Sequence, residues 1–177
     1  SLGLTDNSFT GSIPPEFGNL SNLETLILSE NDLSGSIPVE LSNLSKLRWL
    51  FLDTNNLSGS IPVEMGNLSL LQSLKLFRNG LSGNIPASLG NLSELENLHL
   101  YQTNLSGTLP LAFINLTKLG QFYFYDTSLC EPTTPEFVAW KATVWYWSGT
   151  GIMCEDLPGL ITGIEINQAL GVQKNNE

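Results

Sequence analysis

Aromatic and charged side chains recur at fixed positions through the middle of this chain. They alternate with leucines in Leu-x-Leu segments, which have the two-residue period of a β-strand, so they fall together on one exposed face. The residues with the greatest capacity for ligand binding there are Arg48, Trp49, Phe51, Asp53, Lys75, Phe77, Arg78, His99, Tyr101, Tyr123 and Tyr125. Aromatic groups edged by Arg and Asp side chains have the composition of a binding hot spot. The alternative is structural, because aromatic residues also favour strands and stack across them.

The same set of side chains is poor in catalytic chemistry. His99 is the single histidine, and the sequence has no Cys-x-x-Cys, Gly-x-Ser-x-Gly, phosphate-loop or His-Glu-x-x-His motif. Asp53 and Glu30 can be neighbours across strands, but an open face gives a carboxylate pair no enclosure that would raise a pKa. We therefore predict a protein that is not an enzyme, with no catalytic residues, no metal site and no cofactor.

A repeat of 24 residues positions this face, and its opening leucine recurs at Leu23, Leu47, Leu71, Leu95 and Leu119. One strand cannot bury its own apolar face, so successive units must stack their strands and share a core. Residues 24 apart then become neighbours. This predicts two columns on the exposed face: Phe51, Lys75, His99 and Tyr123, and beside them Asp53, Phe77, Tyr101 and Tyr125.

An asparagine follows the strand in four successive units, at Asn7, Asn31, Asn55 and Asn79. We expect it to point inward and to satisfy backbone groups of neighbouring turns that would otherwise be buried without a partner. Thr103 and Thr127 replace it in the last two units. Threonine is shorter and has fewer polar atoms, so this ladder of hydrogen bonds is expected to weaken toward the C-terminal end.

The Leu-Ser-Gly-x-Ile-Pro segment after the asparagine resembles the plant-type leucine-rich repeat, and the resemblance covers residues 2 to about 129. It implies an α/β repeat fold: a right-handed leucine-rich-repeat solenoid with a curved parallel β-sheet on its concave face. A second short sheet lies beside the first, and short 3-10 or helical segments form the convex face. The family is extracellular and includes receptor-kinase ectodomains, polygalacturonase-inhibiting proteins and secreted proteins of bacteria and algae. It binds peptides, proteins or glycans on the concave face.

The repeat pattern stops near residue 129, which divides the chain into a solenoid (1–129, the first repeat partial), a cap (130–155) and a tail (156–177). Thr134 is a good helix N-cap and Pro135 suits the first helical position. Apolar residues at helical spacing follow, and we expect this helix to cover the last turn of the core. Three tryptophans are expected to pack in the cap, with a ligand cage as the alternative: Trp140, Trp145 and Trp147.

The two cysteines, Cys130 and Cys154, are expected to form a disulfide in an oxidising compartment, the alternative being free thiols in a cytosolic protein. The Leu-Cys-Glu-Pro segment before a Phe-x-x-Trp helix resembles the cap of secreted bacterial leucine-rich-repeat proteins. Residues 160–168 alternate like a strand, so the tail is interpreted as a linker or as the first strand of a following domain.

The charge of −10, from 17 acidic and 7 basic residues, argues against nucleic acid, and no apolar run reaches the length of a membrane span. Seven Asn-x-Ser/Thr sites allow N-glycosylation: Asn19, Asn43, Asn56, Asn67, Asn91, Asn104 and Asn115.

We predict an extracellular module, secreted or attached to a surface, that binds a protein or peptide, or else a glycan, on its concave face. The alternatives are a structural or adhesive spacer and an inhibitor of a secreted enzyme.

Overall fold

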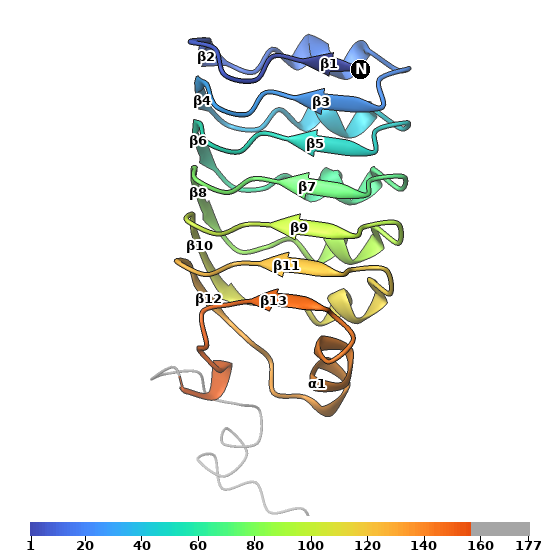
Figure 1. Ribbon diagram of the computed structural model, residues 1–177, viewed down its shortest axis with the longest axis vertical. Helices are drawn as coiled ribbons and strands as arrows, with labels where there is room; N and C mark the ends of the chain where they lie inside the picture. The colour runs from blue at the N-terminus through green and yellow to red at the C-terminus, as the bar shows by residue number, and fades with distance from the viewer. Residues whose placement is uncertain (157–177) are drawn as a thin grey trace, which may run out of the picture.

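The computed structural model describes residues 1–156, which wind into stacked turns with one sheet on the front and one at the side (Figure 1). The front sheet consists of β1 (Leu2–Gly3), β3 (Thr25–Ile27), β5 (Trp49–Phe51), β7 (Ser73–Lys75), β9 (Asn97–His99), β11 (Gln121–Tyr123) and β13 (Tyr146–Ser148). The side sheet consists of β2 (Thr10–Ser12), β4 (Asp32–Gly35), β6 (Asn56–Gly59), β8 (Gly80–Gly83), β10 (Asn104–Thr108) and β12 (Ser128–Cys130). All strand pairs within each sheet are parallel, which confirms the predicted two-sheet solenoid.

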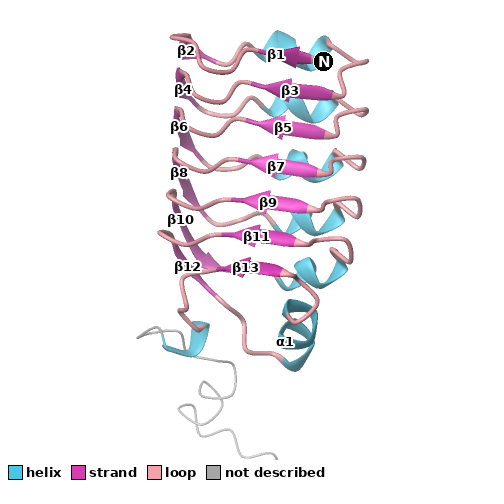
Figure 2. Cartoon of the chain, in the orientation of Figure 1, coloured by secondary structure: helices cyan, strands magenta, loops and turns pink. Residues whose placement is uncertain are grey.

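Five short 3-10 turns stack behind the front sheet (Figure 2). They are η1 (Pro15–Asn19), η2 (Val39–Asn43), η3 (Val63–Asn67), η4 (Ala87–Asn91) and η5 (Leu111–Asn115). Each of η2 to η5 follows a proline whose extended backbone starts the turn. Between the turns and the sheets lies a continuous leucine core, in which Leu50, Leu74 and Leu98 of successive front strands are fully buried.

Strand register follows the repeat length. In the front sheet Trp49 pairs with Ser73 and Ser73 pairs with Asn97, so neighbouring positions are 24 residues apart. The last pairing differs, because Gln121 lies opposite Tyr146 and the offset becomes 25. This one-residue insertion marks the change from the repeats to the cap.

The inward asparagines hold successive turns together. Asn55 donates hydrogen bonds through Nδ2 to the carbonyls of Leu28, Leu52 and Asp53 at 3.0, 3.2 and 3.2 Å. Its Oδ1 accepts from the Leu33 amide at 3.0 Å.

The same set of four hydrogen bonds is made by Asn31 and by Asn79. Asn7, in the first turn, is exposed and donates to carbonyls of its own turn. At Thr103 the hydroxyl donates to the Leu100 carbonyl at 2.7 Å, in place of the three such bonds of an asparagine. The predicted ladder is therefore confirmed for Asn31, Asn55 and Asn79, as is its weakening at Thr103, whereas the prediction was wrong for Asn7, which does not point inward.

A short helix, α1 (Pro135–Lys141), closes the C-terminal end of the core below β13 (Figure 1). The Thr134 side chain accepts from the Phe137 amide, as predicted for an N-cap. Phe137 is fully buried, and the Trp140 indole donates to the Leu116 carbonyl of the preceding turn at 3.2 Å. The predicted Cys130–Cys154 disulfide is formed and ties β12 to the turn η6 (Cys154–Asp156).

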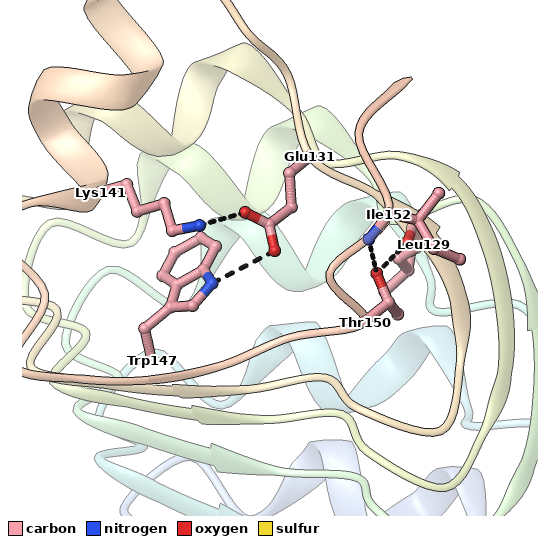
Figure 3. Close-up of polar contacts among 6 residues, drawn as sticks. All are labelled: Leu129, Glu131, Lys141, Trp147, Thr150 and Ile152. Atoms are coloured by element: carbon pink, nitrogen blue, oxygen red, sulfur yellow. Dashed lines mark hydrogen bonds and ion pairs between the residues drawn. The ribbon is translucent and has the colours of Figure 1, made fainter. Parts of the chain in front are cut away.

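A buried carboxylate anchors the cap from inside (Figure 3). Glu131 is 2% exposed and accepts hydrogen bonds from the Lys141 ammonium and, at 3.3 Å, from the Trp147 indole. The Lys141 ammonium also lies 4.7 Å from the centre of the Trp147 ring. Nearby, the Thr150 hydroxyl donates to the Leu129 carbonyl at 2.8 Å. These contacts join the helix, β13 and the last repeat into one unit.

Trp145 does not pack in the cap, so that prediction was wrong for one of the three tryptophans. Trp140 is buried and Trp147 packs edge-on against Phe122 at 5.2 Å, but Trp145 is 85% exposed. The reason lies in the register, because the 25-residue offset places Trp145 opposite Gly120. That position precedes the strand and points away from the core. The predicted strand at residues 160–168 lies outside the described residues.

Candidate functional site

The solvent-facing side of β5, β7, β9 and β11, called the open face below, carries the two predicted columns. Phe51 lies opposite Lys75, Lys75 opposite His99, and His99 opposite Tyr123 in the sheet register. The second column lies two residues beyond the end of each of these strands, and the ring contacts described next place Phe77, Tyr101 and Tyr125 side by side. The prediction that residues 24 apart form these columns is therefore confirmed.

Three aromatic rings of the second column form a continuous stack. The Phe77 and Tyr101 ring centres are 4.3 Å apart with planes 11° from parallel, and those of Tyr101 and Tyr125 are 4.6 Å apart at 14°. These spacings match the strand separation of about 4.8 Å, so the rings stand face to face on neighbouring strands. Their faces cover one another, and a ligand would meet the ring edges. Burial, assisted by Tyr125, raises the pKa of Tyr101, so this phenol keeps its proton and can donate it in a hydrogen bond.

The first column combines a cation, an imidazole and aromatic rings. The Lys75 ammonium lies 4.3 Å from the centre of the Phe51 ring, a cation–π contact. The His99 and Tyr123 rings lie 4.7 Å apart. Trp49, which is 37% exposed, shares with this column a shallow hollow of about 230 Å³.

His99 is neutral at physiological pH. Burial and the nearby Lys75 charge lower its pKa to about 4, although the Gln121 side chain acts in the opposite direction. The buried Nε2 atom of His99 has no hydrogen-bond partner within residues 1–156.

A polar row borders the second column. The Arg78 Nε donates to Gln102 Oε1 at 2.9 Å, and Gln102 Nε2 donates to Asp126 Oδ2 at 3.4 Å. All three residues are exposed and have left-handed backbone, with φ values of 51°, 54° and 52°. Such conformations are unfavourable for residues other than glycine, and the fold holds them because each turn must bend here.

Two of the predicted binding residues contribute little to the exposed part of this surface. Asp53 is only 6% exposed and accepts a 2.8 Å hydrogen bond from the Ser29 hydroxyl, so it forms part of the floor of the column. Burial raises the pKa of Asp53 even though Ser29, Lys75 and Arg78 all favour its charged form. Arg48 is half-buried and lies one residue ahead of β5, outside both columns.

A second surface was missed from the sequence. Gly120 and Trp145 lie opposite each other at the edge where the front strands begin, beside a hollow of about 520 Å³. A signal was available in the repeat position just before each front strand. Successive repeats have Arg48, Gln72 and Glu96 at this position, and the next repeat has Gly120 there.

All seven N-glycosylation sites have exposed asparagine side chains. Five of them end the 3-10 turns: Asn19, Asn43, Asn67, Asn91 and Asn115. These turns lie behind the front sheet (Figure 2), so glycans there would leave the open face free. Use of these sites stays a prediction. No helix in the described residues is long and apolar enough to cross a membrane.

Stacked 24-residue turns with an inward asparagine ladder define a leucine-rich-repeat solenoid. The family model described as "Leucine-rich repeat region" matches residues 1–127, so the chain belongs to that family. No curated protein sequence matches the chain.

Solved structures of plant receptor ectodomains are similar. The Arabidopsis receptor kinase HAESA, solved with the peptide hormone IDA and the co-receptor SERK1, is 38% identical and covers 89% of this chain and 26% of its own, with a TM-score of 0.76. The PEPR1–AtPEP1 structure is 38% identical over 85% of this chain and 21% of its own, with a TM-score of 0.81. A plant ice-binding protein is 32% identical over 77% of this chain and 44% of its own, with a TM-score of 0.71. The chain thus spans only a fraction of each of these proteins.

Proposed function

We propose that this chain is an extracellular recognition segment that binds an extended peptide or a protein segment across the open face. The observation that carries the proposal is the stack of Phe77, Tyr101 and Tyr125, which places large, rigid aromatic groups on a solvent-facing strand surface. Such groups are the usual anchors of protein interfaces. Their exposed edges and phenol hydroxyls suit backbone carbonyls and other acceptors on a ligand.

Charge on the open face supports a ligand with an acidic group. The chain carries −10 overall, yet Lys75 of the first column and Arg78 beside the second are both close enough to Asp53 to favour its charged form. Two other cations among the described residues are engaged in ion pairs, Lys118 with Glu94 and Lys141 with Glu131. A carboxylate on the ligand would find complementary charge between the columns.

Extracellular location is part of the proposal. The Cys130–Cys154 disulfide suits an oxidising compartment. Similar structures include the receptor kinase HAESA with the peptide hormone IDA and the plant peptide hormone receptor RGFR1 with RGF2. Binding without catalysis is the corresponding expectation for this chain.

The proposal can be tested by selecting peptides from a random display library on the immobilised protein and measuring their affinity. The double substitution Phe77→Ala and Tyr101→Ala should weaken selected peptides at least tenfold. Val63→Ala and Leu111→Ala are matched controls, because both residues are exposed hydrophobics on the 3-10 turns. Peptides that bind the double variant as tightly as the wild type would refute the proposal. Sedimentation over a range of concentrations tests the spacer alternative, which predicts self-association.

A further inference from the structure

The edge where the front strands begin carries one side chain per turn, except at Gly120. The fold does not require a glycine there. A Cβ atom added to Gly120 would approach no atom more closely than 3.9 Å, the Glu96 carbonyl oxygen, and its backbone is not left-handed. The missing side chain opens the hollow of about 520 Å³ between Glu96 and Trp145.

The walls of this hollow combine a free aromatic surface with hydrogen-bonding groups. Trp145 is 85% exposed and Tyr146 is 58% exposed, in contrast to the buried aromatic residues of the cap. Glu96, Asn97 and Gln121 also line the hollow. Trp145 therefore has no role in the core, and with Tyr146 it gives the hollow two exposed aromatic side chains beside its polar groups.

We propose that this hollow binds a neutral saccharide, with one pyranose ring stacked on the Trp145 indole in the space left by Gly120. A pyranose has a face of C–H groups and a rim of hydroxyls. The indole complements the face through dispersion and weak C–H contacts. The carboxylate of Glu96 and the amides of Asn97 and Gln121 are the groups that hydrogen-bond the rim.

The observations favour a neutral saccharide over the two nearest alternatives. The Glu96 carboxylate and the overall charge of −10 disfavour an acidic sugar. Lys118 also lines the hollow, but its ammonium is held by Glu94 at 2.7 Å. A proline-rich peptide needs a groove with several aromatic walls. Here two aromatic side chains, Trp145 and Tyr146, line a pocket that is otherwise edged by amides and a carboxylate.

Nuclear magnetic resonance titration tests the proposal through the Trp145 indole N–H signal, assigned by its loss in Trp145→Ala. The probes are hexamers of β-1,4-linked glucose and of β-1,4-linked N-acetylglucosamine, with α-1,4-linked galacturonate as the acidic comparison and a proline-rich decapeptide as the peptide comparison. We expect at least one neutral hexamer to shift the signal, and galacturonate to bind at least tenfold more weakly.

Two variants and two controls locate the site. Trp145→Ala removes the stacking surface, and Gly120→Gln refills the hollow with the side chain found at Gln72 of an earlier turn. Both should weaken the neutral hexamer at least tenfold. Gly3→Gln is the matched control for adding a side chain, because Gly3 has no atom within 4 Å of an added Cβ. Val138→Ala is the control for removing an exposed hydrophobic residue of the cap. Both controls should bind within twofold of the wild type.

Three results would overturn the proposal: no shift with either neutral hexamer, unchanged affinity in Gly120→Gln, or a shift produced by the decapeptide alone. Phe77→Ala with Tyr101→Ala should leave saccharide affinity unchanged, so failure at the open face and failure at this hollow are distinguishable.

Discussion

Removal of one inward asparagine should cost much of the stability of this fold. Asn55→Ala deletes four hydrogen bonds, of which two stay within its own turn and two join it to the preceding turn. The loss is smaller than four independent bonds, because Leu28 O still accepts from Asn31 and Leu52 O still accepts from Asn79. The buried Leu33 amide loses its bond to Asn55 Oδ1, which costs roughly 1–3 kcal/mol.

The hydrogen bonds that Asn55 Nδ2 donates contribute about 1 kcal/mol of further net stabilisation. The total loss of unfolding free energy in Asn55→Ala is therefore about 3 kcal/mol. For a domain of this size the midpoint of thermal unfolding should fall by roughly 6–12 °C. Asn55→Thr should cost about half as much, because a threonine hydroxyl there can make the bond that Thr103 makes. Thr103→Asn is the reciprocal change and should stabilise the protein by about 1 kcal/mol.

Urea unfolding followed by far-ultraviolet circular dichroism measures these differences, with the slope of the transition checked for loss of cooperativity between repeats. A loss below about 1 kcal/mol in Asn55→Ala would contradict the ladder argument. Equal losses in Asn55→Ala and Asn55→Thr would contradict the inference drawn from Thr103.

Three further changes probe the open face and the cap. The His99 pKa is lowered from 6.5 to about 4, so the unfolded chain takes up this proton first and stability should fall as the pH falls from 6.5 to 4. In His99→Gln this loss of stability at low pH should disappear, as urea midpoints at pH 7 and pH 4.5 can measure. An identical pH dependence in the wild type and the variant would contradict a lowered His99 pKa. Replacing Cys130 and Cys154 with Ser should cost about 3 kcal/mol by thermal unfolding, and a loss below about 1 kcal/mol would contradict a role of the disulfide in stability. Glu131→Ala leaves the Trp147 indole and Lys141 without their shared acceptor and should cost about 2–4 kcal/mol, whereas a change below about 0.5 kcal/mol in urea unfolding would show that the pair contributes little.

Most of the open face could be predicted because a repeat converts sequence distance into spatial adjacency. Once the period of 24 is known, Phe77 and Tyr101 must lie on neighbouring strands, and their stacking follows from the strand separation. The exposure of each side chain was harder to predict. Asp53 faces the same side as Phe77, yet the Ser29 hydroxyl and the surrounding side chains bury it. The small differences in side-chain size that decide such burial are not contained in a repeat pattern.

The sequence by itself determined the repeat, the two sheets, the asparagine ladder, the disulfide and the columns of the open face. The repeat, the ladder and the columns depend on local spacing that recurs from turn to turn, whereas the second sheet followed from the family resemblance and the disulfide from the two cysteines of the cap. Only the tertiary structure decided what happens where the repetition ends. The offset changes from 24 to 25 at β13, which turns Trp147 toward the core and Trp145 into solvent opposite Gly120. The hollow there arises from the packing of the cap on the last repeat. The cap does not follow the 24-residue repeat, so the repeat pattern cannot predict this contact.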